Sequence, residues 1–183
     1  VVDCLILVMP AYNEAANLEQ VLAGWYPVVT WTGPDSRLVV VDDGSTDETP
    51  ELLERLRSQM PKLTVLTKPN GGHGAAVHFG YQYALRSGAD YVFQTDSDGQ
   101  TDPAEFWSMW EERRAYDWQI GHRRRRQDGW SRRLVTKVLR AAIFLCCQVG
   151  LPDANAPFRL VRAQTLAQCM ERIPEDCPLT NVW

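Results

Sequence analysis

The hydrophobic residues of this chain fall into short runs that are separated by longer stretches with helical periodicity. Runs of strand length occupy residues 5–9, 37–41, 63–66 and 91–93. Their nearly unbroken apolar character is typical of buried strands. Pro10 is expected to end the first run. A shorter strand is expected at residues 118–120.

The stretches between these runs predict helices. Their expected positions are residues 14–25, a segment that follows a cap at Thr46 or Asp47, a segment from the 69–74 loop to about Ser87, and a segment that opens at Asp102-Pro103. Strands that alternate with helices predict an α/β fold with a mostly parallel, doubly wound sheet and helices on both faces. Ligands of such sheets bind at the carboxyl ends of the strands.

Acidic or glycine-rich clusters follow the predicted strands. These clusters are Glu14, Asp42-Asp43, the loop at 70–74 and Asp96-Asp98. Because the carboxyl ends of parallel strands share one edge of the sheet, the clusters are expected to converge there. Four converging clusters indicate a binding site more strongly than any one of them.

The stretch QTDSDGQTDP carries the densest charge of these clusters. Asp96 and Asp98 are two residues apart, and Ser97 and Gly99 make plausible a backbone turn that brings both carboxylates to one ligand. Two carboxylates with open positions suit Mg²⁺ or Mn²⁺, with diphosphate oxygens completing the shell. A plain acidic turn remains the alternative. A helix-loop-helix calcium site fits poorly, because its sixth position, a glycine in such loops, is Thr101 here.

The glycine-rich loop PNGGHG is a weaker signal. Its Gly72-x-Gly74 spacing is a dinucleotide fingerprint that lacks the third glycine, and it has no Gly-Lys-Ser/Thr of a P-loop. His73 is a candidate phosphate contact, with a structural or solvent-exposed histidine as the alternative.

Charge is unevenly distributed along the 183 residues. The net charge is −4, yet residues 122–140 hold eight Lys/Arg and one acid, or +7, which leaves −11 on the rest. A basic island on an acidic body favours a local anionic partner over nucleic acid. Within it, residues 130–150 predict an amphipathic basic helix, which either lies on an anionic membrane surface or packs on the sheet with a solvated basic face.

Length and cysteine usage narrow the class further. The length fits one domain over residues 1–183, and no apolar run is long enough for a membrane span. The chain begins without Met and stops abruptly, so we expect a segment truncated at its C-terminus. Five cysteines without a CxxC pair favour a reducing compartment over a disulfide scaffold or a zinc site.

The motifs MPAYNEAANL, VVVDDGSTDET, the Asn-x-Gly-x-Gly loop and TDSDGQTDP occur here in a fixed order. In this order the chain resembles the family 2 glycosyltransferases of the GT-A fold. The later VGLPDANAPFRLVRAQTL resembles the Asp-x-x-x-x-Phe-Arg segment of the polyprenyl-phosphate branch, similar to dolichyl-phosphate mannose synthase. The resemblance covers nearly the whole chain. It implies a GT-A catalytic domain.

The resemblance also implies roles for particular residues. Positions that match nucleotide contacts are Pro10, Tyr12, Glu14, Asp42, Asp43 and Gly72. Positions that match the metal and diphosphate motif are Asp96, Asp98 and Gln100. Positions that match the later arginines and the ends of the Asp-to-Phe-Arg segment are Arg123, Arg132 or Arg133, Asp153 and Arg159. Asp98, Asp153 and Arg123 are the candidate catalytic residues.

Together these features predict a metal-dependent, inverting enzyme that moves a sugar from a UDP- or GDP-linked donor to polyprenyl phosphate. It is expected at the cytoplasmic face of a membrane. A phosphate acceptor is already an anion and needs positive charge, whereas a saccharide hydroxyl needs a base, for which Asp153 is the candidate. Transfer to a saccharide and a non-catalytic nucleotide-sugar binding module remain alternatives. A nucleotidyltransferase is disfavoured, because PAYNEAANL replaces its early glycine-rich loop.

Overall fold

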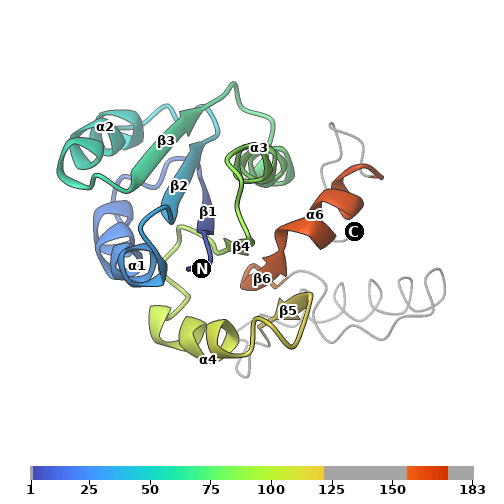
Figure 1. Cartoon of the computed structure of the whole chain (residues 1–183). Helices are drawn as coiled ribbons and strands as arrows, with labels where there is room; N and C mark the ends of the chain where they lie inside the picture. Colours follow the sequence, from blue (N-terminus) through green and yellow to red (C-terminus); the bar gives the residue numbers. More distant parts are fainter. Residues whose placement is uncertain (1, 122–155, 173–183) are drawn as a thin grey trace, which may run out of the picture.

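The computed structural model describes residues 2–121 and 156–172, which form a six-stranded sheet with helices on both faces (Figure 1). The strands are β1 (Leu5–Ala11), β2 (Arg37–Asp42), β3 (Leu63–Thr67), β4 (Tyr91–Gln94), β5 (Trp118–Ile120) and β6 (Arg159–Arg162). The helices are α1 (Leu18–Thr32), α2 (Thr49–Gln59), α3 (His73–Arg86), the 3-10 turn η1 (Pro103–Glu105), α4 (Phe106–Glu111) and α6 (Ala163–Met170). The predicted helix at 130–150 lies outside the described residues.

The strand order is β3-β2-β1-β4-β6-β5. Strands β1 to β4 are parallel, and β6 runs antiparallel to both β4 and β5. The expected mostly parallel, doubly wound sheet is therefore confirmed. The sequence did not predict β6, whose residues Arg159 and Arg162 interrupt the apolar pattern.

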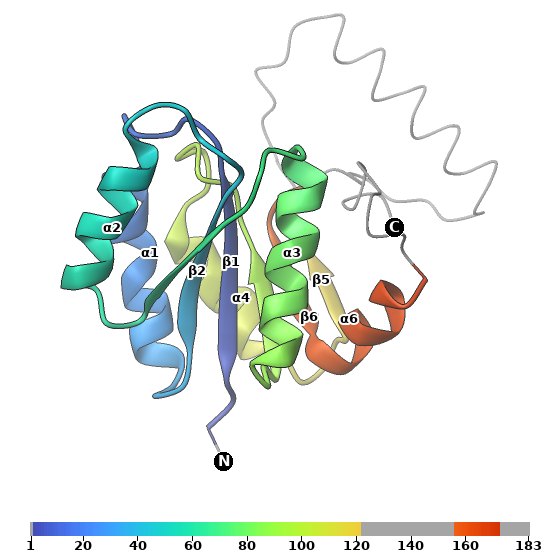
Figure 2. The ribbon, with the colours of Figure 1, turned by 90° about the horizontal axis from the view of Figure 1, so that it is seen from above.

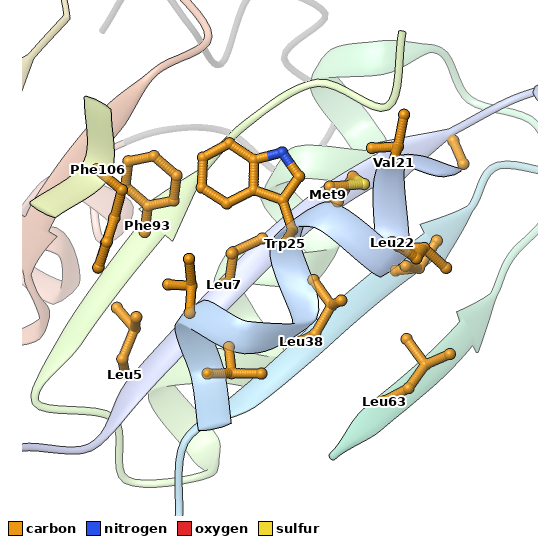
Figure 3. Close-up of a cluster of buried hydrophobic side chains, with 14 of the residues drawn as sticks. Leu5, Leu7, Met9, Val21, Leu22, Trp25, Leu38, Leu63, Phe93 and Phe106 are labelled. Atoms are coloured by element: carbon orange, nitrogen blue, oxygen red, sulfur yellow. The ribbon is translucent and has the colours of Figure 1, made fainter. Parts of the chain in front are cut away.

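Alternate residues of the buried strands serve two separate cores, as the period of two requires. One face carries Leu5, Leu7 and Met9 of β1 beneath α1, α2 and α4, and the other carries Ile6 and Val8 beneath α3 and α6 (Figure 2). Figure 3 shows the first core around Trp25, whose ring centroid lies 5.4 Å from that of Phe93. Both faces of the sheet are thus covered, which explains the continuous apolar runs.

The prediction that Pro10 ends the first strand is wrong. Strand β1 continues through Pro10 to Ala11, which pairs with Asp42 of β2. The ladder with β4 stops earlier, at Val8. The amide position of Pro10 points to the β4 side, because the Val8 carbonyl two residues earlier accepts from Thr95 there and the pattern repeats every two residues. The missing N–H of the proline therefore costs no ladder hydrogen bond.

The first helix differs from its predicted bounds of 14–25. Residues 14–17 form a turn, in which Asn17 and Leu18 both donate to the Glu14 carbonyl at 3.0 Å, and helix α1 starts only at Leu18. It then continues through Pro27 to Thr32. Pro27 is tolerated on the exposed side, where water can satisfy the freed carbonyl group.

Two other predicted helix starts have different outcomes. Asp102 accepts a hydrogen bond from the Ala104 amide at 2.9 Å, which confirms the cap before Pro103. Helix α2 begins at Thr49 rather than directly after Thr46 or Asp47, and Glu48 is its cap residue. Asp47 still accepts from the Thr49 amide at 3.0 Å, so its carboxylate satisfies one orphan donor of the first turn.

Candidate active site

A cleft of about 460 Å³ opens at the carboxyl edge of the parallel strands. It is lined by residues that follow β1, β2 and β4 and by the start of α3, namely Pro10, Ala11, Tyr12, Glu14, Asp43, Asn70, Gly72, His73, Ala76, Asp96, Ser97 and Asp98. Figure 2 shows the loops after these strands at the same end of the sheet as the start of α3. The expected convergence of the four clusters is therefore confirmed.

The Asp96–Asp98 turn brings both aspartates to this cleft. Gly99 has a φ of 73°, which reverses the chain as expected. The hydroxyls of Thr95 and Thr101 lie 2.8 Å apart and close the base of the turn. The Gln100 amide donates to Asp98 at 3.0 Å and fixes that carboxylate. The Gln100 side chain is exposed and does not line the cleft, so its role as a metal ligand stays a prediction.

The turn after β1 presents Tyr12 and Glu14 to the same cleft. Between them, Asn13 is the one described residue other than glycine with a positive φ, at 55°. Such a conformation is unfavourable for a residue with a β-carbon and persists only where the surroundings fix it. Here the Asn13 side-chain oxygen accepts from the amides of Thr46 at 2.8 Å and Asp47 at 3.3 Å.

The segment 45–49 bonds back to this turn. Ser45 accepts from the Asn13 amide at 3.0 Å, Thr49 accepts from the Glu14 amide at 2.9 Å, and Asp47 accepts from the Ala15 amide at 3.3 Å. The YNEA and STDET segments are therefore held to each other by short polar side chains. The sequence analysis did not predict these hydrogen bonds between the two segments. The density of Ser, Thr, Asn and Asp in both motifs is the signal that indicates side-chain-to-backbone bonding.

Glu14 is electrostatically unfavourable in this position. Burial, together with the charges of Asp98, Asp47 and Asp96, raises the pKa of Glu14 above its ordinary value, against a hydrogen bond with Asn17 that lowers it. The cleft thus collects negative charge and favours a cationic ligand.

The two aspartates after β2 have different surroundings. Asp43 lines the cleft, and its carboxylate accepts from Lys68 Nζ at 2.6 Å and from the amides of Gly71 and Gly72 at 3.0 and 2.7 Å. Asp42 is buried beside it, and its Oδ1 accepts from the Ser45 amide at 3.0 Å. Its Oδ2 has no hydrogen-bond partner among the described residues. The structure therefore brings Asp43, but not Asp42, to the cleft.

Arg159 is buried in strand β6 and is not among the residues that line the cleft. It is 2% exposed on β6, pairs in register with Gln94, and its Nε donates to the Ala156 carbonyl at 2.7 Å. Tyr81 donates to Gln94 nearby, and burial raises the pKa of Tyr81 to about 12 despite the charge of Arg159. The binding role predicted for Arg159 remains a prediction. The other predicted residues, Arg123, Arg132, Arg133 and Asp153, lie outside the described residues.

The cleft has a donor set that fits a divalent cation only in part. The carboxylates of Asp96 and Asp98 are hard oxygen ligands of the kind that Mg²⁺ and Mn²⁺ prefer. In the part of the chain that the structure describes, no three His, Cys, Asp or Glu side chains are grouped to hold a metal ion by themselves. Two carboxylates by themselves do not complete the coordination shell of such an ion.

Solved structures with the same architecture define the class of fold. The 1–349 fragment of S. aureus TarS superposes with a TM-score of 0.63 at 19% identity, over 98% of this chain and 52% of that one. Mannosyl-3-phosphoglycerate synthase from Rubrobacter xylanophilus gives a TM-score of 0.67 at 16% identity, over 88% of this chain and 54% of that one. At these identities the likeness shows the fold, which is that of the GT-A glycosyltransferases.

Sequence similarity then gives the family. Residues 6–169 match the model of Glycosyl transferase family 2, and the chain belongs to this family. An undecaprenyl-phosphate 4-deoxy-4-formamido-L-arabinose transferase of Pseudomonas fluorescens (strain Pf0-1) is 29% identical over 93% of this chain and 51% of its own length. An undecaprenyl-phosphate mannosyltransferase of Micrococcus luteus is 27% identical over 88% of this chain and 68% of its own length. The chain thus spans about half the length of the first relative.

Proposed function

We propose that this chain is the donor-binding, catalytic part of an inverting glycosyltransferase that moves a sugar from a nucleotide-diphosphate donor to polyprenyl phosphate. The observation that carries the proposal is that Asp43 after β2 and the Asp96–Asp98 turn after β4 line the same cleft. The names of the two relatives, both undecaprenyl-phosphate sugar transferases, support the acceptor class.

The donor lies across the end of β1 in this proposal. Its diphosphate faces Asp96 and Asp98, and its nucleoside extends toward Asp43. A UDP- or GDP-linked sugar is the proposed donor. Glucosyl-3-phosphoglycerate synthase from Mycobacterium tuberculosis, a structural neighbour with a TM-score of 0.65 and 20% identity over 88% of this chain and 57% of that one, was solved with UDP.

Asp96 and Asp98 are the residues proposed to hold Mg²⁺ or Mn²⁺, with Gln100 as a further predicted ligand. When bound, the ion would stabilise the negative charge that develops on the leaving diphosphate, usually a large part of catalysis in such transfers. The protein's own contribution is to preorganise the carboxylates. The Gln100 amide fixes Asp98, and the Thr95–Thr101 pair fixes the turn that carries both.

The acceptor side of the reaction rests on residues outside the described part. Arg123, Arg132 and Arg133 belong to the basic island, which is proposed to receive a lipid phosphate at the cytoplasmic face of a membrane. The predicted basic helix at 130–150 would lie on that surface. Within residues 2–121 and 156–172, no helix has the length and apolar character needed to cross a bilayer.

The lipid acceptor is tested with the full-length protein, labelled UDP- and GDP-sugars, and vesicles that contain polyprenyl phosphate. We expect a labelled product that partitions into chloroform. Transfer to added saccharides instead, with loss of activity in Asp153→Asn, would replace the lipid acceptor by a hydroxyl acceptor. Donor binding without transfer to any acceptor would favour a binding module.

The cation assignment is tested by nucleotide affinity in the presence of Mn²⁺. Asp98→Asn should weaken this affinity by at least about tenfold, by analogy with the 10–100-fold losses seen when a metal site is perturbed. Asp102→Asn is the matched control, because it removes a charge four residues away while asparagine still caps the following turn. Unchanged Mn²⁺-dependent affinity in Asp98→Asn would contradict the assignment.

A further inference from the structure

The core beneath α3 contains a buried hydrogen bond between two polar side chains. Tyr81 of α3 is 3% exposed and Gln94 of β4 is 1% exposed. The Tyr81 hydroxyl donates to Gln94 Oε1. Burial raises the pKa of Tyr81 to about 12, so the hydroxyl keeps its proton and stays a donor near neutral pH. Such a bond has one favourable geometry, whereas apolar side chains would fill the same place with more than one packing.

Gln94 is the last residue of β4, and the sheet holds it on both sides. It pairs in register with Val8 of β1 and with Arg159 of β6, and both ladders end there. The chain then enters the turn that carries Asp96 and Asp98 to the cleft. The bond from Tyr81 therefore holds β4 at its last paired residue, two positions before Asp96.

Tyr81 belongs to the helix that supplies another side of the cleft. Helix α3 begins at His73, and Gly72 and His73 both line the cleft. His73 Nε2 lies 3.8 Å from Asp96 Oδ1, so the start of the helix and the turn after β4 meet there. Tyr81 lies eight residues further on, about 12 Å along the helix. The Tyr81–Gln94 bond thus joins, beneath the cleft, the helix and the strand that form two of its sides.

The third element at this bond is β6. Residues that are paired in an antiparallel ladder point to the same face of the sheet, so Arg159 and Gln94 both lie on the face that α3 covers. Arg159 is buried, its Nε donates to the Ala156 carbonyl at 2.7 Å, and its charge acts on Tyr81. A buried cation stays where hydrogen bonds compensate its lost hydration. The Tyr81–Gln94 bond therefore lies where α3, β4 and β6 meet.

We infer that Tyr81 and Gln94 are positioning residues for the Asp96–Asp98 turn. Their bond fixes the start of α3 relative to this turn, so that groups from both meet the same diphosphate and its cation. The inference rests on the proposed function, because it requires that a nucleotide-diphosphate donor binds in the cleft. Neither side chain is among the residues that line the cleft, so both act through the residues that do.

The measurement is the gain in nucleotide affinity that Mn²⁺ provides. Dissociation constants of UDP and GDP are determined by titration calorimetry with the full-length protein, once with Mn²⁺ and once with EDTA. Their ratio does not respond to a general loss of stability, which weakens both affinities alike. Tyr81→Phe should lower this ratio by about tenfold, the lower end of the losses seen when a residue that supports a metal site is removed.

Tyr26→Phe is the matched control. It also removes a hydroxyl from a hydrogen bond, since Tyr26 accepts from the Lys62 amide at 3.2 Å. Lys62 directly precedes β3, at the edge of the sheet opposite the cleft. Tyr26→Phe should therefore leave the ratio unchanged, even where urea titration shows a similar loss of stability.

Gln94→Leu tests the same bond from its other partner, and it serves alone if Tyr81→Phe does not fold. The double variant completes a cycle, in which its ratio should be no lower than that of the more affected single variant, because both changes remove one bond. Losses that add in the double variant would overturn the inference. So would a wild-type ratio in Tyr81→Phe, which would leave the bond a purely structural one and the proposed function intact.

Two outcomes of the wild-type titration reach beyond this bond. Binding of UDP or GDP that is equally tight with Mn²⁺ and with EDTA would overturn the inference together with the cation assignment. Failure to bind either nucleotide would remove the proposed function itself, and the inference with it.

Discussion

Gly80 lets helix α3 lie directly on the central strands, and this close contact gives a sharp test of the packing. A β-carbon at Gly80 would lie 2.4 Å from Val8 Cγ1 and 3.2 Å from Val41 Cγ2, well inside ordinary van der Waals contact. Val8 is fully buried in β1 and branched at its β-carbon, so it has little freedom to move. Gly80→Ala must therefore push α3 away from the sheet.

Two opposing effects set the expected magnitude. Overpacking of a core typically costs about 1–3 kcal/mol. Alanine in place of glycine inside a helix returns about 1 kcal/mol. Gly80→Ala should therefore lower the free energy of unfolding by up to about 2 kcal/mol, which corresponds to a loss of up to roughly 8 °C in Tm for a chain of this size.

Removing the obstacle should reverse the sign. Val8→Ala alone should cost about 2 kcal/mol through lost burial and a cavity. In that background the alanine at position 80 fills the vacated space, and Gly80→Ala should stabilise the protein by up to about 1 kcal/mol. Urea titrations of the four proteins measure the difference at constant m-value. The same change in both backgrounds would refute the packing described here. Because α3 begins at the cleft, nucleotide affinity should fall in Gly80→Ala and recover in the double variant.

The remaining predictions concern polar residues. Asn13→Ala should lower the free energy of unfolding by about 2–3 kcal/mol, because it strains a left-handed residue and removes the acceptor for the Thr46 amide; Asn13→Asp, which keeps both features, should match the wild type in the same titration. Partial burial alone would raise the pKa of Asp3, but the hydrogen bond and charge of Arg113 lower it below 3.8; Arg113→Met should therefore destabilise the protein at pH 7, and the loss should shrink as the pH falls below 3.8. Burial and neighbouring carboxylates raise the pKa of Glu14 above 4.5, so the wild type loses stability as the pH rises from 4.5 through the raised pKa. Glu14→Gln should therefore be more stable than the wild type at pH 7, and a gain in stability that persists well below pH 4.5 would contradict this cause.

Much of the fold could be predicted because its strands are buried on both faces. A run such as residues 37–41 predicts a buried strand when it is followed by Asp-Asp-Gly-Ser and a helical pattern, and the structure has strand β2 there. The convergence of Glu14, Asp43 and the Asp96–Asp98 turn followed from parallel topology, since all lie after carboxyl ends of strands. Local rules also succeeded at Asp102, where the cap depends on neighbours two residues away.

Features that depend on distant partners could not be predicted. Strand β6 pairs with β4 across more than sixty residues, and the buried Arg159 breaks its apolar pattern. Asn13 looks like any polar loop residue until its oxygen is seen to accept amides from residues 46 and 47. Asp42 and Asp43 are adjacent and of the same residue type, so the sequence does not distinguish them. In the structure Asp42 accepts from the Ser45 amide in the turn, whereas Asp43 lines the cleft.

The strand order explains why the cleft lies where it does. From β1 the chain moves outward through β2 and β3, with α1 and α2 on one face, and then α3 returns over the opposite face to place β4 on the other side of β1. The ladder between β1 and β4 ends at Val8 and Gln94, whereas the ladder between β1 and β2 continues to Ala11. Strands β1 and β4, where the strand order reverses, therefore separate beyond Val8. The crevice between them receives Glu14 from one side and Asp96 from the other. Because α3 makes the return crossing, its first residues, Gly72 and His73, arrive at this crevice as well, so the reversal of strand order alone brings together residues that are more than eighty positions apart in the sequence.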